Sequence, residues 1–137
     1  MEPADKLAIH ELLSRAAYGL DEQDLGAIER CFAPKASMVV RITDGPTVGP
    51  FDGRDAIMKL MADSIAAQTD KRRHVVSNIF FEAENDAACT VVSNLTLFAT
   101  ENGANRLVTT GLYRDKVAKA DGEWLIVGRE LALDMPY

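Results

Sequence analysis

Residues that bind metals or form disulfides are scarce in this chain, which has two histidines and two cysteines. These four side chains show no short ligand spacing, so neither a structural zinc site nor a cofactor is expected. Two cysteines do not make a disulfide framework, and a reducing, cytoplasmic compartment is the default expectation. Apolar runs fall well short of 18 residues and the first residues lack a signal-peptide pattern. We therefore predict neither a membrane span nor export.

Basic residues are also too few for a nucleic-acid-binding protein. Lysine and arginine total 15 against 21 acidic residues, a net charge of −6, whereas phosphate binding depends on clustered positive charge. What the chain does have is a globular composition, with 47% apolar and 26% charged residues. Its length suits one domain spanning residues 1–137.

The first part of the chain has the apolar spacing of helices. Pro3 suits the first turn of a helix whose apolar residues recur at intervals of three and four as far as Leu20. Asp24 is of the residue type that caps helices, and it predicts a short second helix that stops at Pro34. A third helix is predicted from about Gly53.

The remaining segments have the pattern of β-strands. One strand is predicted at 37–42, followed by a turn-rich segment and a short partner strand. Four further runs are rich in β-forming residues: 72–83, 87–100, 105–118 and 123–134. Turn-forming pairs separate them, namely Asn85-Asp86, Asn102-Gly103 and Asp121-Gly122. Helices followed by an antiparallel meander predict an α+β fold with its sheet curled over the helices.

One charged residue interrupts an apolar row in the last predicted strand. Strict alternation places these residues on one face: Leu125, Val127, Arg129, Leu131 and Leu133. A buried guanidinium is costly unless it meets a carboxylate or an anionic ligand. Three roles are therefore open to Arg129: it forms a structural ion pair, it reaches water at the sheet edge, or it binds a ligand. A bulge would shift the register by one residue.

Asp21 and His74 are the other two candidates. Asp21 ends the inner row of the first helix, where its alternative role is to cap the second helix. His74 lies near the start of a strand that has no uniformly apolar face there. Its alternative role is that of a packed or surface imidazole. The second histidine, His10, falls on the polar face of its helix and is expected to be solvated.

The ordered combination of these features resembles the SnoaL-like branch of the nuclear transport factor two-like superfamily. Landmarks that match run through nearly the whole chain: Leu20-Asp21 with Asp24, Cys31-Phe32-Ala33-Pro34, Phe51-Asp52-Gly53-Arg54, Arg73-His74-Val75-Val76-Ser77-Asn78, Gly111-Leu112-Tyr113-Arg114-Asp115, and Trp124 with Arg129 five residues later. The resemblance implies a cone-shaped α+β barrel with three N-terminal helices packed in a curved, mainly antiparallel sheet. It also implies a homodimer or homotrimer.

Within that superfamily, scytalone dehydratase and hexachlorocyclohexane dehydrochlorinase are similar in having Asp at the position of Asp21 and His at that of His74. The dehydrochlorinase also has an Arg that matches Arg129. The resemblance implies a lyase or isomerase in which Asp21 orients His74 for proton abstraction and Arg129 faces the developing negative charge. Two positions depart from these enzymes: the dehydrochlorinase's Lys is Ala16 here, and the dehydratase's second His falls on Phe98.

The same resemblance implies a cavity for a small hydrophobic, aromatic or polycyclic molecule. Candidates for its wall are Tyr18, Met38, Asn94, Phe98 and Tyr113. A second similar group, the small β-subunits of aromatic-ring-hydroxylating dioxygenases, carries R-H-x-x-S-N and V-x-S-N motifs that appear here at 73–78 and 92–94. Those subunits are mainly structural. Three functions therefore stay open: a lyase or isomerase, a non-catalytic ligand binder, and a dioxygenase-subunit-like protein.

Overall fold

The computed structural model covers residues 1–137 and contains three helices and a six-stranded sheet. The helices are α1 (Pro3–Asp21), α2 (Leu25–Glu29) and α3 (Arg54–Ala67). The strands are β1 (Phe32–Ile42), β2 (Thr47–Asp52), β3 (Lys71–Glu84), β4 (Ala88–Glu101), β5 (Ala104–Ala120) and β6 (Glu123–Leu133). Their order is β2-β1-β6-β5-β4-β3, and only β1 and β6 pair in parallel. The predicted α+β class and the mainly antiparallel sheet are confirmed, although the sheet is not closed into a barrel.

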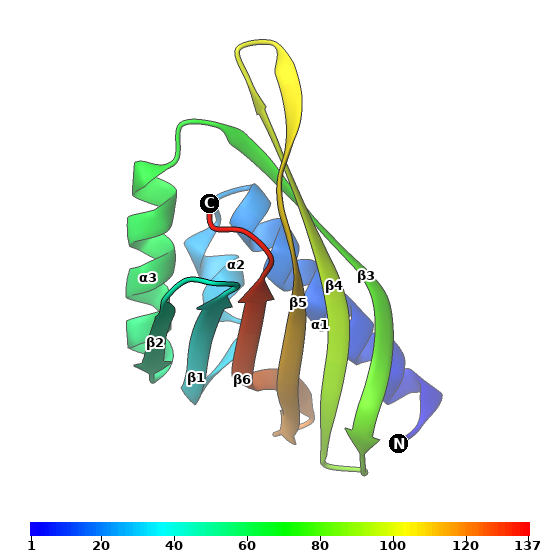
Figure 1. Ribbon diagram of the computed structural model, residues 1–137. Coiled ribbons are helices and arrows are strands. Elements are labelled where there is room, and N and C mark those ends of the chain that lie inside the picture. The colour runs from blue at the N-terminus through cyan, green and yellow to red at the C-terminus, as the bar shows by residue number, and fades with distance from the viewer.

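The sheet curves around the helices (Figure 1). α1 crosses behind β3, β4 and β5, while α3 lies along the β2 edge. The β4–β5 hairpin extends beyond the other strands, and the chain after β6 turns toward the helices. The concave face of the sheet is therefore the covered one.

α1 forms where the apolar spacing predicts it. Pro3 occupies the first turn, where its missing N–H costs no hydrogen bond, and Glu2 and Asp5 form a capping box. The inner face buries Ile9, Leu12, Leu13 and Ala16. His10 lies exposed on the outer face, as expected.

α2 is shorter than the sequence predicts. Asp24 caps it as expected, since its carboxylate accepts a hydrogen bond of 3.0 Å from a backbone N–H in the first turn. The helix nevertheless ends at Glu29 and not at Pro34, because β1 begins at Phe32, which pairs with β6. Pro34 falls in the irregular part of that pairing, between Phe32 and Ser37. A proline is tolerated at such a place because no regular ladder bond needs its N–H.

Tight turns connect the long strands where the turn-forming pairs predict them. Asn102 and Asp121 have φ angles of 52° and 51°, and each precedes a glycine with positive φ. This backbone is typical of two-residue hairpins whose twist matches the paired strands. Between β3 and β4, the Asn85 side-chain oxygen accepts hydrogen bonds from the backbone N–H groups of Ala87 and Ala88.

Strict alternation along β6 fails in its first half. Lys116 of β5 pairs with Gly128 and Val117 pairs with Ile126, so Val127 is an extra residue in a β-bulge. As a result, Ile126 faces the core and Val127 does not. The predicted inward positions of Leu125 and Val127 are wrong, whereas that of Arg129 is right.

The bulge lies at the boundary between two apolar clusters. The larger cluster packs under the helices and includes Ile126 and both cysteines, which are free and buried as expected for small core residues. The smaller cluster consists of Leu95, Leu97, Tyr113, Leu131 and Leu133. No helix has the length and apolar character that a membrane span requires.

Candidate functional site

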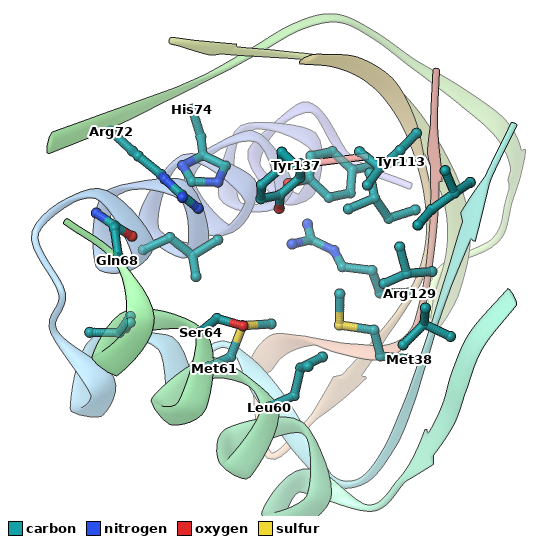
Figure 2. Close-up of a pocket in the computed structure, with 17 residues that line it drawn as sticks. Met38, Leu60, Met61, Ser64, Gln68, Arg72, His74, Tyr113, Arg129 and Tyr137 are labelled. Carbon is teal, nitrogen blue, oxygen red and sulfur yellow. The ribbon is translucent and has the colours of Figure 1, made fainter. Parts of the chain in front are cut away.

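An apolar cavity of about 230 Å³ lies between α3, the strands β1 and β6, and the first residues of β3. Its wall is mainly aliphatic and thioether, with Met38 from β1 and Leu60 and Met61 from α3 (Figure 2). A few polar side chains also reach it: Ser64, Gln68, Arg72, His74, Tyr113, Arg129 and Tyr137. Mostly apolar concave spaces with a few placed polar groups are the usual form of small-molecule sites.

The structure brings Asp21 and His74 together at the edge of this cavity. Asp21 is the last residue of α1, and His74 is the fourth residue of β3. The Asp21 carboxylate oxygen Oδ1 lies 2.6 Å from the ring nitrogen Nδ1 of His74 and also accepts a 2.9 Å hydrogen bond from its backbone N–H. Both side chains are largely buried, with exposed fractions of 7% for His74 and 11% for Asp21. Asp21 does not cap α2, because Asp24 does so.

This contact determines which nitrogen of His74 is free. A carboxylate only accepts hydrogen bonds, so Nδ1 carries a proton and donates it in the hydrogen bond to Asp21. The other nitrogen, Nε2, then has its lone pair available and takes no hydrogen bond from the protein. Asp21 does not line the cavity, whereas His74 does. The His74 ring reaches the cavity (Figure 2), and the Asp21 carboxylate contacts this ring at Nδ1 without lining the cavity itself.

Arg129 forms the ion pair that the sequence allows as one of its alternatives. Its Nε and Nη2 atoms donate to the two carboxylate oxygens of Asp115 at 2.8 and 3.0 Å, and both side chains are almost fully buried. Burial alone lowers the pKa of Arg129, but Asp115 more than offsets this effect and the pKa is raised. The remaining nitrogen, Nη1, has no protein partner, and Arg129 also lines the cavity (Figure 2).

Tyr113 packs against this guanidinium. The Arg129 guanidinium carbon lies 4.1 Å from the centroid of the Tyr113 ring. Burial raises the pKa of the Tyr113 hydroxyl, and Arg129 opposes only part of this effect. Tyr113 therefore stays protonated and is a hydrogen-bond donor. Tyr113 and Met38 are the two predicted wall residues that line the cavity.

Three predicted wall residues lie elsewhere. Tyr18 is 61% exposed on the surface of α1. Asn94 and Phe98 are exposed on β4, because their neighbours Ser93 and Leu97 point inward and successive side chains of a strand face opposite sides. The structure therefore corrects the predicted positions of Tyr18, Asn94 and Phe98, none of which lines the cavity.

Four polar residues of the wall are missed by the sequence analysis: Ser64, Gln68, Arg72 and Tyr137. Arg72 stands two residues before His74 and so shares its face of β3. That spacing was the available signal. Tyr137 follows the last strand in an irregular segment, which has no period from which its direction can be predicted. No three of the His, Cys, Asp and Glu side chains lie close enough together to hold a metal ion.

A family model described as a SnoaL-like domain matches residues 1–130. The chain belongs to this family. The resemblance found in the sequence motifs is thereby confirmed. A search of curated proteins finds no match.

Solved structures share the fold of this SnoaL-like chain. A protein of unknown function from Nostoc punctiforme with a cystatin-like fold is 22% identical, with a TM-score of 0.81 over 99% of this chain and 97% of its own. The β-subunit of a provisionally assigned aromatic-ring-hydroxylating dioxygenase from Novosphingobium aromaticivorans is 17% identical, with a TM-score of 0.84 over 98% of this chain and 92% of its own. A provisionally assigned scytalone dehydratase from the same organism is 24% identical, with a TM-score of 0.78 over 96% of this chain and 85% of its own. Likeness at these identities establishes the fold alone.

Proposed function

We propose that this SnoaL-like protein is a cofactor-free lyase or isomerase in which His74 removes a proton from a carbon atom of a small hydrophobic substrate. The observation that carries this proposal is the 2.6 Å contact between Asp21 and His74 at the edge of an apolar cavity. The carboxylate fixes the tautomer in which Nε2 is the base, and it stabilises the imidazolium that forms when Nε2 takes a proton. A positioned base of this kind contributes on the order of 10²–10⁴-fold in rate.

Arg129 has a supporting electrostatic role in this proposal. Its charge is partly neutralised by Asp115, yet Nη1 stays without a protein partner at a residue that lines the cavity. A fixed donor that is already desolvated stabilises developing negative charge without reorganising during the reaction. The cavity volume of about 230 Å³ suits a molecule of roughly one or two rings.

The experiment measures proton abstraction directly. The probe is 2-tetralone, a two-ring ketone with acidic C–H bonds, incubated with the protein in deuterated buffer and followed by proton NMR. Wild-type protein is expected to accelerate exchange, and both His74→Ala and Asp21→Asn are expected to lose about 100-fold or more of that acceleration. Circular dichroism checks that both variants are folded.

His10→Ala is the matched control, because His10 is the only other histidine and lies exposed on α1. Its exchange rate is expected to equal that of the wild type. Equal rates for wild type and His74→Ala would contradict the proposal. Binding of 2-tetralone without exchange would favour a non-catalytic ligand binder, and co-purification with a larger iron–sulfur partner would favour a dioxygenase-subunit-like role.

A homodimer or homotrimer formed through the outer sheet face is a further part of the proposal. Apolar side chains are exposed on neighbouring strands of the sheet, among them Val75 and Phe80 of β3 and Phe98 of β4. Covering them in an oligomer removes apolar surface from water. Light scattering coupled to size exclusion tests this, and a monomer at micromolar concentration would contradict it.

A further inference from the structure

A second arrangement in the cavity repeats the one around Tyr113, in which a carboxylate holds a guanidinium and the guanidinium lies over a tyrosine ring. Asp70 Oδ1 accepts a 2.8 Å hydrogen bond from Nε of Arg72, and the Asp70 side chain is only 5% exposed. The Arg72 guanidinium carbon lies 5.3 Å from the centroid of the Tyr137 ring. Both Arg72 and Tyr137 line the cavity. The site thus contains two tyrosines that are each covered by a fixed positive charge.

Hydrogen bonds to β5 hold the segment that carries Tyr137. The backbone N–H of Asp134 donates to the carbonyl oxygen of Thr110 at 2.9 Å. The hydroxyl of Thr109 donates to the carbonyl oxygen of Met135 at 2.7 Å. These bonds fix the two residues that follow β6, so the direction in which Tyr137 leaves the sheet is set by β5.

The hydroxyl groups of Tyr113 and Tyr137 both lack a protein partner at this site. Tyr137 is 53% exposed as a whole residue, yet burial raises the pKa of its hydroxyl, with Arg72 opposing this effect. Tyr137 is thus partly open to solvent, while its side chain lines the cavity beside that of Tyr113 (Figure 2). Tyr137 also contributes to raising the pKa of Tyr113, and the two rings lie next to each other above Arg129 (Figure 2).

The polar groups of the cavity are consequently unequal in kind. Ser64 and Gln68 each have both donor and acceptor atoms. Of the other polar groups, two protonated phenols and two guanidinium groups are donors, whereas His74 Nε2 is the one nitrogen acceptor. Unpaired buried donors are costly, so a ligand that supplies an oxygen acceptor is favoured over one that does not. A purely hydrocarbon or halogenated ligand leaves these donors unsatisfied.

We infer that Tyr113 and Tyr137 are catalytic residues that donate hydrogen bonds to a substrate oxygen on which negative charge develops. The substrates are then small apolar carbonyl compounds, and not halogenated alkanes. The inference rests on the proposed function of His74 and deepens it. As Nε2 takes the proton from the carbon beside the carbonyl, the C–H electron pair forms a carbon–carbon double bond and the carbonyl π pair moves to oxygen. The two phenols hold the enolate oxygen and keep their own protons.

The experiment distinguishes recognition of a negatively charged oxygen from recognition of the aromatic ring itself. The probes are 4-nitrophenolate, which has an anionic oxygen, and 4-nitroanisole, which carries a methyl ether there. At about pH 8 both tyrosines are protonated, because burial raises the pKa of each hydroxyl. Wild-type protein is expected to bind 4-nitrophenolate at least about tenfold more tightly than 4-nitroanisole, because hydrogen bonds to charged groups are the stronger ones.

Removing one hydroxyl at a time assigns the donors. Tyr113→Phe and Tyr137→Phe are each expected to weaken 4-nitrophenolate binding about tenfold while leaving 4-nitroanisole binding unchanged. Tyr18→Phe is the matched control, because Tyr18 is exposed and outside the cavity. Unchanged 4-nitrophenolate affinity in both cavity variants, or equal losses for the two probes, would overturn the inference.

The two proposals fail in different ways. The 2-tetralone assay depends on the base His74, whereas the comparison of Tyr113→Phe and Tyr137→Phe in the 4-nitrophenolate assay depends on the two hydroxyls. If 2-tetralone exchange proves independent of His74 while the tyrosine variants still lose 4-nitrophenolate affinity, catalysis by His74 is wrong and the oxygen-binding role stands. If exchange depends on His74 and the tyrosine variants behave as wild type in both assays, only the role of the tyrosines is wrong.

Discussion

Arg129 and Asp115 are joined by two hydrogen bonds, one to each carboxylate oxygen, and their side chains are only 4% and 0% exposed. Breaking such a pair leaves one buried charge without a partner. Asp115→Ala is therefore expected to lower the free energy of unfolding by about 3–5 kcal/mol, measured by urea titration. The surface pair of Arg114 and Glu82 provides the control, because Glu82→Ala is expected to cost at most about 1 kcal/mol. Equal effects of the two substitutions would contradict this account.

Close backbone contact makes Gly111 sensitive to substitution. A Cβ added there would lie 2.6 Å from the carbonyl oxygen of Ala132 on the paired strand β6. Gly111→Ala is expected to lower the free energy of unfolding by about 1–3 kcal/mol, because the backbones must separate. Gly128→Ala is the comparison, since the nearest atom to its added Cβ is 3.7 Å away. Thermal unfolding compares the two variants, and Gly111→Ala is expected to have the lower melting temperature. Equal melting temperatures would contradict the predicted clash.

Both cysteines are expected to be unreactive in the folded protein. Burial raises the pKa of Cys31, and it raises the pKa of Cys89 to about 11. Against the ordinary value of 9.0, the thiolate fraction of Cys89 at neutral pH falls roughly a hundredfold. Ellman's reagent at about pH 8 should label neither thiol in native protein and both in urea. Ser14→Cys, on the exposed face of α1, should react quickly with the reagent, and equally fast labelling of the native wild type would contradict the burial of both thiols.

The carboxylate of Asp5, in the first turn of α1, is expected to make the free energy of unfolding depend on pH. The indole N–H of Trp124 donates to Asp5 Oδ1 at 2.9 Å, and this bond, with help from Lys119, lowers the pKa of Asp5. A lowered pKa in the folded state means that the stabilisation is present above the unfolded carboxyl value of about 3.9 and is lost as pH falls through the folded value.

Asp5→Asn removes this carboxylate and tests that sign. The variant is expected to be less stable than the wild type at neutral pH, and the gap should narrow as the pH falls below about 4. Trp124 is the only tryptophan, so its fluorescence follows the transition in both proteins. A gap that is constant from neutral to acid pH would contradict the assignment.

The fold is largely predictable from the sequence because its signals are local. Apolar spacing predicts α1, and Asn102 and Asp121 mark hairpins that depend only on their own backbone. The end of α2 is not predictable in this way, because pairing of Phe32 with β6 decides it and that partner lies far along the chain. A local sequence pattern is thus sufficient to predict an element unless a contact with a distant part of the chain decides where that element ends.

The candidate site is less predictable than the fold. Asp21 interrupts the inner row of its helix, but His74 interrupts no clear pattern, and in the sequence only the family resemblance links the two residues. Asn94 is polar in mid-strand and nonetheless faces outward, so polarity alone does not place a side chain in a cavity. Tyr137 belongs to no helix or strand, and hydrogen bonds to β5 hold the segment that leads to it.

The bulge at Val127 divides β6 into two halves that pack in different places. On one side of it, Ile126 belongs to the larger apolar cluster under the helices, and on the other Leu131 and Leu133 form part of the cavity wall. Substitutions beyond the bulge can change the shape of the cavity while the interior keeps its packing. The second half of β6 is therefore the place to begin a redesign of the cavity.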